Sequence, residues 1–348
     1  MRGLIRVDAS LRLGSGHLMR CLTLAKALRQ QGFQLDFICR DAPGHLHAMV
    51  LNEGFTLLRL PLLPEQTKMD ERSDAAQSLA LLDQHYDLLI VDHYQLAAAY
   101  CSLLRQRCRV ILQIDDLANR QLDCDLLLDQ NLLPDSASRY LPYLPRHCQT
   151  MLGPAFALLR DEFYLSSETK REHLLIGFGG SDEQNLTSMA ILALTRLKLS
   201  DLAADIVIGA NNPWRAEVTQ LVSSLPNAQL HVQCDYMAKL MRRARLMLGS
   251  GGSSHWERCI CHLPGLIVTV AENQQATTAY LDQLGACIWL GQAADMTVEG
   301  FAEQLNDSLS QPDRLTKMAQ IAGSLVPANA GTPAVVQKII TRLRGKDV

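Results

Sequence analysis

Short apolar runs alternate with segments of helical periodicity along the first half of the chain. Residues 4–7 form one such run, and after a polar, glycine-containing loop the apolar residues between His17 and Gln30 recur at helical spacing. The same criterion predicts further buried strands at residues 33–39, 87–91, 109–114 and 125–129. Continuous apolar strands separated by helices are typical of a parallel sheet that helices cover on both faces.

The second half of the chain repeats this pattern. We expect a helix over residues 186–197 and another that opens near His255. The apolar runs predict strands at residues 173–178, 204–209, 229–232, 245–248 and 265–270. The predicted fold class is therefore α/β, with two Rossmann-like, doubly wound parallel-sheet domains and a ligand-binding cleft between them.

The predicted domain boundaries follow from these elements and from local composition. The polar stretch 162–172 is the predicted linker between an N-terminal domain at 1–161 and a C-terminal domain at 173–332. Residues 333–348 are predicted to form a C-terminal helix, and the sequence does not indicate where that helix docks. The chain has 348 residues, and single hydrophobic cores stop growing near about 250–300 residues, so two domains are expected.

Composition narrows the classes of partner. The formal net charge is -3, so the chain has no basic excess that would favour nucleic acid or an anionic membrane surface. The ten cysteines include no CxxC pair and no Cys/His pairing with zinc spacing, which indicates reduced, buried thiols in a cytoplasmic protein. No apolar stretch reaches the ~18 residues of a membrane span or resembles a signal peptide. We expect no nucleic acid partner and no stable membrane association.

Glycine-rich loops join a predicted strand to a predicted helix at three places, Gly14–His17, Gly179–Ser181 and Gly249–Ser254. Such junctions lie at the carboxyl edge of a parallel sheet, where the free N–H groups of the loop and of the helix start favour phosphate groups. None of them matches the Walker motif, which disfavours a P-loop NTPase, and the first lacks the third glycine of a dinucleotide fingerprint. Three such loops favour a ligand that both halves bind.

Two histidines are candidates for acid–base chemistry. His17 follows Gly16 at the start of a predicted helix, and imidazole titrates near neutral pH, so His17 is the candidate general base. The alternative is that it caps the helix or binds phosphate. His93 follows a predicted strand and is a second candidate, with a supporting structural role as its alternative.

Other polar residues near the loops suit a nucleotide. The hydroxyl groups of Ser253 and Ser254 suit a diphosphate, and Glu257, one turn into the following helix, could accept hydrogen bonds from ribose. The alternative for Glu257 is that it complements the helix dipole. The pair Asp115–Asp116 is the nearest candidate for a metal-binding pair, but closing a turn at a strand end is the favoured interpretation.

Several motifs together resemble the UDP-2,4-diacetamido-2,4,6-trideoxy-β-L-altropyranose hydrolases. They are Arg6–Ser10 with Gly14–Cys21, Val91–Tyr94, Asp115–Asp116, Gly153–Phe163, Gly179–Asp182 and Ala271–Gln275. The resemblance runs in order from residue 4 to about 290. This family is similar in fold to the GT-B glycosyltransferases, especially the inverting enzyme that adds N-acetylglucosamine to lipid I, so the resemblance implies that fold here.

The resemblance also implies site residues. His17 matches the catalytic histidine, which acts on the water that attacks the anomeric carbon. The segment Asp235–Met237 resembles the place where the backbone reads uracil, and residues 249–257, with the large Trp256, are more glycine-rich than the family pattern. The implied substrate-binding residues are Gly14, Gly16, Tyr94, Gly180, Ser181, Met237, Ser253, Ser254, Glu257, Asn273 and Gln274.

The implied activity is hydrolysis of a UDP-sugar in pseudaminic acid biosynthesis and flagellin glycosylation. Water attacks C1, UDP leaves with inversion, and neither a cofactor nor a metal is implied; the partners are the UDP-sugar and water, and a monomer is expected. Three alternatives remain open: an inverting glycosyltransferase, a hydrolysing UDP-N-acetylglucosamine 2-epimerase, and a non-catalytic sugar-nucleotide sensor. The presence of His17 in its GxGH loop argues against the sensor.

Overall fold

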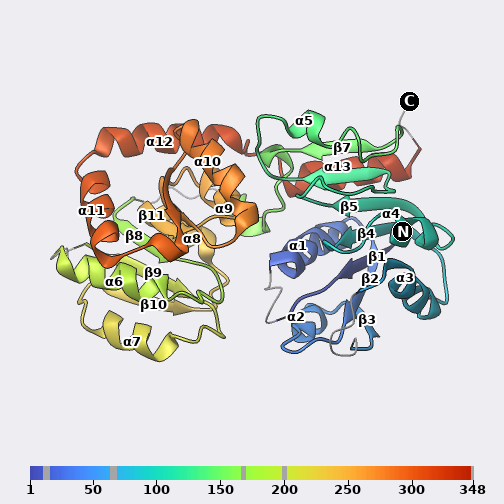
Figure 1. Ribbon diagram of the computed structural model, residues 1–348, viewed down its shortest axis with the longest axis horizontal. Coiled ribbons are helices and arrows are strands. Elements are labelled where there is room, and N and C mark those ends of the chain that lie inside the picture. The colour runs from blue at the N-terminus through green and yellow to red at the C-terminus, as the bar shows by residue number, and fades with distance from the viewer. Residues whose placement is uncertain (11–15, 63–68, 166–169, 198–201, 346–348) are drawn as a thin grey trace. The chain divides into compact units, whose positions relative to one another are not determined.

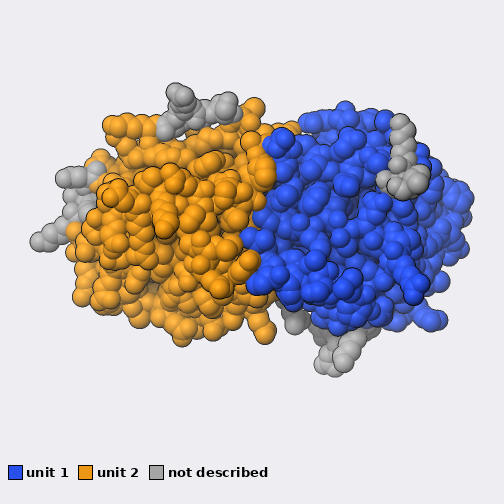
Figure 2. Space-filling model, turned by 90° about the horizontal axis from the view of Figure 1, so that it is seen from above, with its two compact units in different colours: residues 1–159, 329–348 blue, residues 160–328 orange. Residues whose placement is uncertain are grey.

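The chain folds into two compact units. The computed structural model describes residues 1–10, 16–62, 69–165, 170–197 and 202–345. Unit 1 comprises Met1–Leu159 with Asn329–Val348, and unit 2 comprises Arg160–Ala328 (Figures 1 and 2). Within the described residues, no helix has both the length and the apolar character that crossing a bilayer requires.

Unit 1 contains one fully parallel sheet with the strand order β3-β2-β1-β4-β5-β6-β7. The order reverses between β1 and β4, which is the topological switch point of a doubly wound sheet. The strands are β1 Arg2–Val7, β2 Gln34–Arg40, β3 Thr56–Leu60, β4 Tyr86–Asp92, β5 Cys108–Ile114, β6 Leu126–Asp129 and β7 Gln149–Leu152. The helices are α1 Gly16–Gln30, α2 His47–Asn52, α3 Glu71–Ala80, α4 Ala98–Leu104, α5 Ser136–Arg139, η1 Pro154–Phe156 and α13 Thr332–Leu343.

Unit 2 contains a second fully parallel sheet, with the order β10-β9-β8-β11-β12-β13 and its switch point between β8 and β11. The strands are β8 His173–Gly177, β9 Ala204–Ile208, β10 Ala228–Val232, β11 Ala244–Ser250, β12 Gly265–Thr269 and β13 Ile288–Gln292. The helices are η2 Asp161–Phe163, α6 Leu186–Arg196, α7 Arg215–Ser223, α8 Met237–Arg243, α9 Ser254–Ile260, η3 Glu272–Gln274, α10 Gln275–Gln283, η4 Ala293–Asp295, α11 Val298–Leu309 and α12 Pro312–Leu325. The prediction of two doubly wound parallel sheets is confirmed.

Successive side chains of the central strand β1 point to opposite faces of the unit 1 sheet, and a hydrophobic core covers each face. Ile5 and Val7 pack with residues of α1 and α13, whereas Leu4 packs on the other face with residues of α3 and α4. The C-terminal helix α13 therefore belongs to unit 1 (Figure 1). Its start is fixed by hydrogen bonds from Leu159 N to Thr332 Oγ1 at 2.8 Å and from Gly331 N to Ala155 O at 2.7 Å.

The stretch predicted as a linker, 162–172, lies within unit 2. Glu162 accepts a hydrogen bond from Ala238 N at the start of α8, and Arg242 donates to the Glu162 and Phe163 carbonyl oxygens. These contacts fix the segment to unit 2, and the chain passes between units at residues 159–160 instead. Residues 166–169 of the stretch lie outside the described part of the chain.

A buried ionic network crosses the carboxyl half of the unit 1 sheet. Arg6, fully buried on β1, donates to both oxygens of Asp8 at 2.5 and 3.0 Å and to both oxygens of Asp74 on α3 at 3.0 and 2.8 Å. Arg40 on β2 donates to Asp74 at 2.7 Å. Burial alone would raise the pKa of Asp74, but hydrogen bonds and charge from Arg6 and Arg40 hold it below its usual value.

We expect Asp74→Asn to lower the free energy of unfolding of unit 1 by about 3–5 kcal/mol at neutral pH, because it leaves two buried guanidinium groups short of negative charge. Urea unfolding followed by circular dichroism measures this. The control is Glu53→Gln, which breaks the half-exposed Lys26–Glu53 pair and should cost about 0–1 kcal/mol.

The contribution of Asp74 to the free energy of unfolding should depend on pH. Because the folded-state pKa of Asp74 lies below its usual value, its stabilisation is present at neutral pH and is lost as the pH falls below about 4, the usual carboxyl range. The difference in stability between the wild type and Asp74→Asn should therefore shrink in acid. A difference that stays constant from neutral pH down to the acid transition would contradict this account.

Candidate functional site

His17 lies at the switch point of the unit 1 sheet. It occupies the second position of α1, after the loop that follows β1, while Asp92 ends the neighbouring strand β4 in register with Val7. His17 Nδ1 lies 2.6 Å from Asp92 Oδ1. A carboxylate only accepts hydrogen bonds, so the shorter of the two contacts at Nδ1 assigns the proton to this nitrogen, although Arg20 Nη2 lies 3.0 Å from the same atom. The second ring nitrogen, Nε2, is then the lone-pair atom of the imidazole.

Arg20, one helical turn after His17, holds the same carboxylate. Its Nε and Nη2 atoms donate to Asp92 Oδ2 and Oδ1, both at 2.6 Å. Asp92 is buried, with 1% of its side chain exposed. Burial alone would raise the pKa of Asp92, but the charges of Arg20 and His17 and their hydrogen bonds hold it well below its usual value. The carboxylate is therefore ionised and fixes the His17 tautomer.

Tyr94 and Asp116 complete the cluster around the imidazole. The rings of His17 and Tyr94 meet edge to face, with centroids 4.7 Å apart. The Tyr94 hydroxyl donates to Asp116 Oδ2 at 3.1 Å, and Arg20 Nη1 lies 3.8 Å from the same oxygen. Burial raises the pKa of Asp116, and the charge of Arg20 partly offsets this effect. The negative charges of Asp115 and Asp92 raise the pKa further. Tyr94, a predicted site residue, therefore lies beside His17.

His93, the second acid–base candidate, and Asp115, from the candidate metal-binding pair, have structural roles. His93 accepts a hydrogen bond from Gln95 N at Nδ1, and its Nε2 lies 3.3 Å from Asp8 Oδ2 in the buried network. Asp115 accepts from the N–H groups of Leu117 and Ala118, so it closes the turn after β5. The contacts therefore favour the alternative given for His93 and the favoured interpretation of Asp115.

Of the two glycines predicted to bind the substrate in the first loop, the structure describes only Gly16. Gly14 lies outside the described residues. Gly16 is exposed as the first residue of α1, and a Cβ built on it would meet nothing within 4 Å. Packing therefore does not require glycine at position 16, and close approach of a ligand to the backbone remains the predicted reason for it.

Two of the predicted nucleotide loops flank the switch point of unit 2. Gly179–Ser181 follows β8, and Gly249–Ser254 spans the end of β11 and the start of α9. Gly179 has φ +89°, and a Cβ there would lie 3.8 Å from Ser250 Oγ, so the two loops approach each other closely. Gly180 and Ser181 are exposed. Their backbone N–H groups are placed where a phosphate could be bound.

The N-terminus of α6 differs from the prediction of free N–H donors. The buried carboxylate of Asp182 accepts hydrogen bonds from Leu186 N at 2.9 Å and Thr187 N at 3.0 Å. It thus occupies the place where the helix start would bind an anion. The expectation that this helix offers its N-terminus to phosphate was wrong, and the donors left at this junction belong to the loop.

The serine and glutamate candidates lie together at α9. Ser253 is exposed, and Ser254 Oγ donates to Ser250 O at 2.7 Å, so this hydroxyl group secures the loop and keeps only its acceptor function for a ligand. Glu257 Oε1 lies 3.4 Å from Arg160 Nη2. Burial raises the pKa of Glu257, and the charge of Arg160 partly offsets this effect.

Met237 lies at the start of α8, and Gln274 lies against the Gly249–Ser254 loop. Met237 opens α8, whose next N–H group, at Ala238, is capped by Glu162 Oε2 at 3.1 Å. Gln274 Oε1 accepts from Val270 N, and a Cβ on Gly251 would lie 3.2 Å from that oxygen. Gln274 therefore packs against the glycine loop, while Asn273 is exposed beside it.

A chain of hydrogen bonds that sequence reasoning missed supports this loop. Arg258 Nη2 lies 3.3 Å from His255 Nδ1, His255 Nε2 lies 2.9 Å from Thr278 Oγ1, and Thr278 Oγ1 donates to Gln274 O at 2.8 Å. Trp256, unusual in the sequence, is buried in the interior, with 1% of it exposed. It therefore does not compete with the serines for space in the loop.

Three residues with contacts at these sites have no role predicted from the sequence, although they lie in the motifs that carry the family resemblance. They are Asp92, Arg20 and Arg160. A signal existed for the first two: Asp92 stands at a strand end beside His93, and Arg20 lies on the same helix face as His17. No signal in the sequence pairs Arg160 with Glu257, since 97 residues separate them.

Comparison with known proteins agrees with this architecture. Residues 174–332 match the glycosyltransferase family 28 C-terminal domain. The chain is 27% identical to the UDP-2,4-diacetamido-2,4,6-trideoxy-beta-L-altropyranose hydrolase of Campylobacter jejuni, over 82% of this chain and 97% of that one. It is 24% identical to the spore coat polysaccharide biosynthesis protein SpsG of Bacillus subtilis, over 82% and 83% of the two chains.

Solved structures share the whole architecture. MurG of Acinetobacter baumannii superposes with a TM-score of 0.67 at 17% identity, covering 98% of this chain and 99% of that chain. S. aureus MnaA, solved with UDP, gives 0.66 at 12% identity, with coverage of 99% and 96%. The chain therefore has the GT-B fold, matches the glycosyltransferase family 28 C-terminal domain over residues 174–332, and is similar in sequence to an altropyranose hydrolase over four-fifths of its length.

Proposed function

We propose that the protein hydrolyses a UDP-sugar, UDP-2,4-diacetamido-2,4,6-trideoxy-β-L-altropyranose, to UDP and the free sugar. The observation that carries the proposal is the His17–Asp92 pair, which leaves one imidazole nitrogen as a base. The Campylobacter jejuni relative, named as the hydrolase of this compound and matched over 97% of its length, supports the choice of substrate. The product would feed pseudaminic acid biosynthesis.

In the proposed reaction, His17 Nε2 accepts a proton from water as the water oxygen forms a bond to C1 of the sugar. The bond between C1 and the oxygen of the β-phosphate breaks, its electron pair stays with UDP, and the configuration at C1 inverts. Asp92 stabilises the imidazolium that forms, and the bidentate contact from Arg20 keeps Asp92 in place. Tyr94, beside the imidazole, orders the space next to the attacking water.

The nucleotide half of the proposal rests on unit 2. Its two glycine loops offer N–H and hydroxyl donors to the diphosphate, where negative charge increases as the bond breaks. Glu257 accepts hydrogen bonds from the ribose hydroxyl groups, and Met237, at the start of α8, lies in the segment that reads uracil. The contact of Glu257 with Arg160 supports this role, because it fixes the carboxylate in the absence of ribose.

A second candidate is an inverting glycosyltransferase that uses the same base on an acceptor hydroxyl group. The match of residues 174–332 to glycosyltransferase family 28 favours it. The two candidates differ only in the nucleophile, water or an alcohol. The nucleophile can therefore be assigned by whether UDP release needs an added acceptor.

We expect His17→Asn to reduce UDP release by roughly 10²–10⁴-fold, the usual contribution of a general base. The affinity for UDP itself should stay within about threefold of the wild type, since the change removes an interaction of the reacting centre only. Proton NMR of the products and calorimetry with UDP measure the two quantities. His85→Asn, an exposed histidine, is the matched control. Wild-type turnover in His17→Asn would remove this residue from the mechanism.

We expect Asp92→Asn to reduce kcat by about 10²–10⁴-fold, because an amide can donate to Nδ1 and so favour the wrong tautomer. Asp129→Asn is the matched control, since Asp129 is equally buried at the end of β6 but has a pKa raised to about 6 by burial. Single-turnover rates with circular dichroism as a folding check test this. A rate for Asp92→Asn equal to that of Asp129→Asn would contradict the proposed role.

Hydrolysis in ¹⁸O-labelled water should leave the released UDP unlabelled, because the proposed cleavage is at the C1–O bond and the phosphate keeps its oxygen. Phosphorus NMR detects the isotope shift at the β-phosphate. Label in UDP would indicate attack at phosphorus and overturn the proposed reaction. Turnover only with an added alcohol would favour the glycosyltransferase, a sugar changed at C2 the epimerase, and UDP-sugar binding without turnover the sensor.

A further inference from the structure

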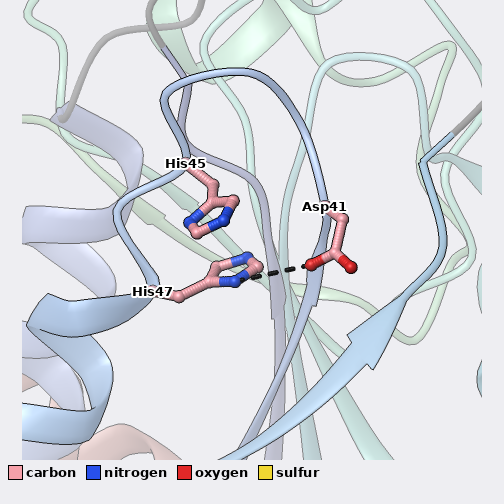
Figure 3. Close-up of side chains that lie close together, drawn as sticks. All are labelled: Asp41, His45 and His47. Atoms are coloured by element: carbon pink, nitrogen blue, oxygen red, sulfur yellow. Dashed lines mark ion pairs between the residues drawn. The ribbon is translucent and has the colours of Figure 1, made fainter.

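A second histidine cluster lies at the carboxyl end of β2 in unit 1. Asp41 follows β2, His45 lies in the loop that leads into α2, and His47 is the first residue of α2. One possible ligand atom from each of the three side chains lies within 4.8 Å of the others. Figure 3 shows the carboxylate of Asp41 directed at the two imidazole rings. None of these residues takes part in the proposed hydrolysis.

The hydrogen bonding of His47 is incomplete. Its side chain is buried, and Nε2 has no hydrogen-bond partner among the described residues. Nδ1 lies 3.5 Å from Asp41 Oδ1, which is long for a hydrogen bond between these groups (Figure 3). A buried ring nitrogen without a partner and a carboxylate oxygen thus belong to one small cluster, and a bound cation would supply the missing partner.

We propose that Asp41, His45 and His47 bind one divalent transition-metal ion, for which Zn²⁺ is the best match. Two imidazoles and one carboxylate are the donor set that Zn²⁺ accepts readily, whereas Mg²⁺ and Ca²⁺ prefer oxygen ligands throughout. Three protein ligands leave the fourth tetrahedral position to water.

Metal binding requires one imidazole ring to turn, and His45 is the residue whose ring can do so. Its ring stacks on that of His47 with centroids 3.8 Å apart and planes 14° from parallel. Parallel rings direct their lone pairs side by side, so one ring must turn for both to point at a single ion. His45 is exposed, and its ring can turn without disturbing the interior.

Arg59 on β3 sets the strength of the site. Its Nε and Nη2 donate to the two oxygens of Asp41, both at 3.0 Å. This contact orients the carboxylate as an outer-shell partner does, but its positive charge opposes a cation. The Arg59 side chain is 59% exposed, so solvent screens the repulsion. Arg59→Gln should therefore strengthen metal binding.

The test uses the untagged, full-length protein after treatment with a chelator. Calorimetry with Zn²⁺ should give one site, and His45→Gln should weaken it by at least the roughly 10–100-fold that losing an outer-shell partner costs. Arg59→Gln should tighten it by roughly two- to fivefold. The matched control is His147→Gln, an exposed histidine paired with Asp125, which should leave the affinity unchanged.

The absorption spectrum of the Co²⁺-loaded protein identifies the ligands, because thiolate ligation adds a charge-transfer band and imidazole–carboxylate ligation does not. We expect no such band. Three outcomes would overturn the proposal: no Zn²⁺ binding tighter than about 1 mM, equal affinity in the wild type and His45→Gln, or a thiolate band. The readout is metal binding itself, so failure of this test leaves the proposed hydrolysis untouched.

Discussion

One buried carboxylate organises the candidate site. Asp92 is almost inaccessible to solvent and would be costly to keep ionised without partners. Arg20 provides a bidentate contact and His17 a short hydrogen bond, so both oxygens are paired. The tautomer of His17, and with it the availability of Nε2, depends on this charge. Tyr94 and Asp116 then depend on the positions of His17 and Arg20.

The two switch points carry different chemistry on the same topology. In unit 1, the strand ends β1 and β4 bring together ionised side chains around an imidazole. In unit 2, the strand ends β8 and β11 carry glycine loops, and the carboxylate of Asp182 is taken up in capping α6. Backbone donors suit a bound diphosphate, whereas a proton transfer needs a titratable group. This contrast fits a division between nucleotide binding and chemistry.

Sequence patterns predicted the strands whose burial is uniform, and the unit 1 strands that they missed are those whose burial is mixed. β1 and β4 are almost fully buried and read as apolar runs, but β3 and β7 alternate with exposed positions such as Thr56 and Thr150 and were not predicted. His17 and Tyr94 could be predicted as neighbours from motifs. The Asp92 contacts could not, because they depend on the register of strands that lie more than 70 residues apart in sequence.

Whether a histidine can act as a base depends on how many of its ring nitrogens already have a hydrogen-bond partner. His93, His231 and His255 have contacts at both nitrogens, which lock the ring and leave no lone pair for a substrate. His17 has its Nδ1 fixed by Asp92, while the described residues provide no partner for Nε2. A base needs one nitrogen held and the other free. Of these four histidines, His17 alone combines the two, which argues for the proposed chemistry independently of any relative.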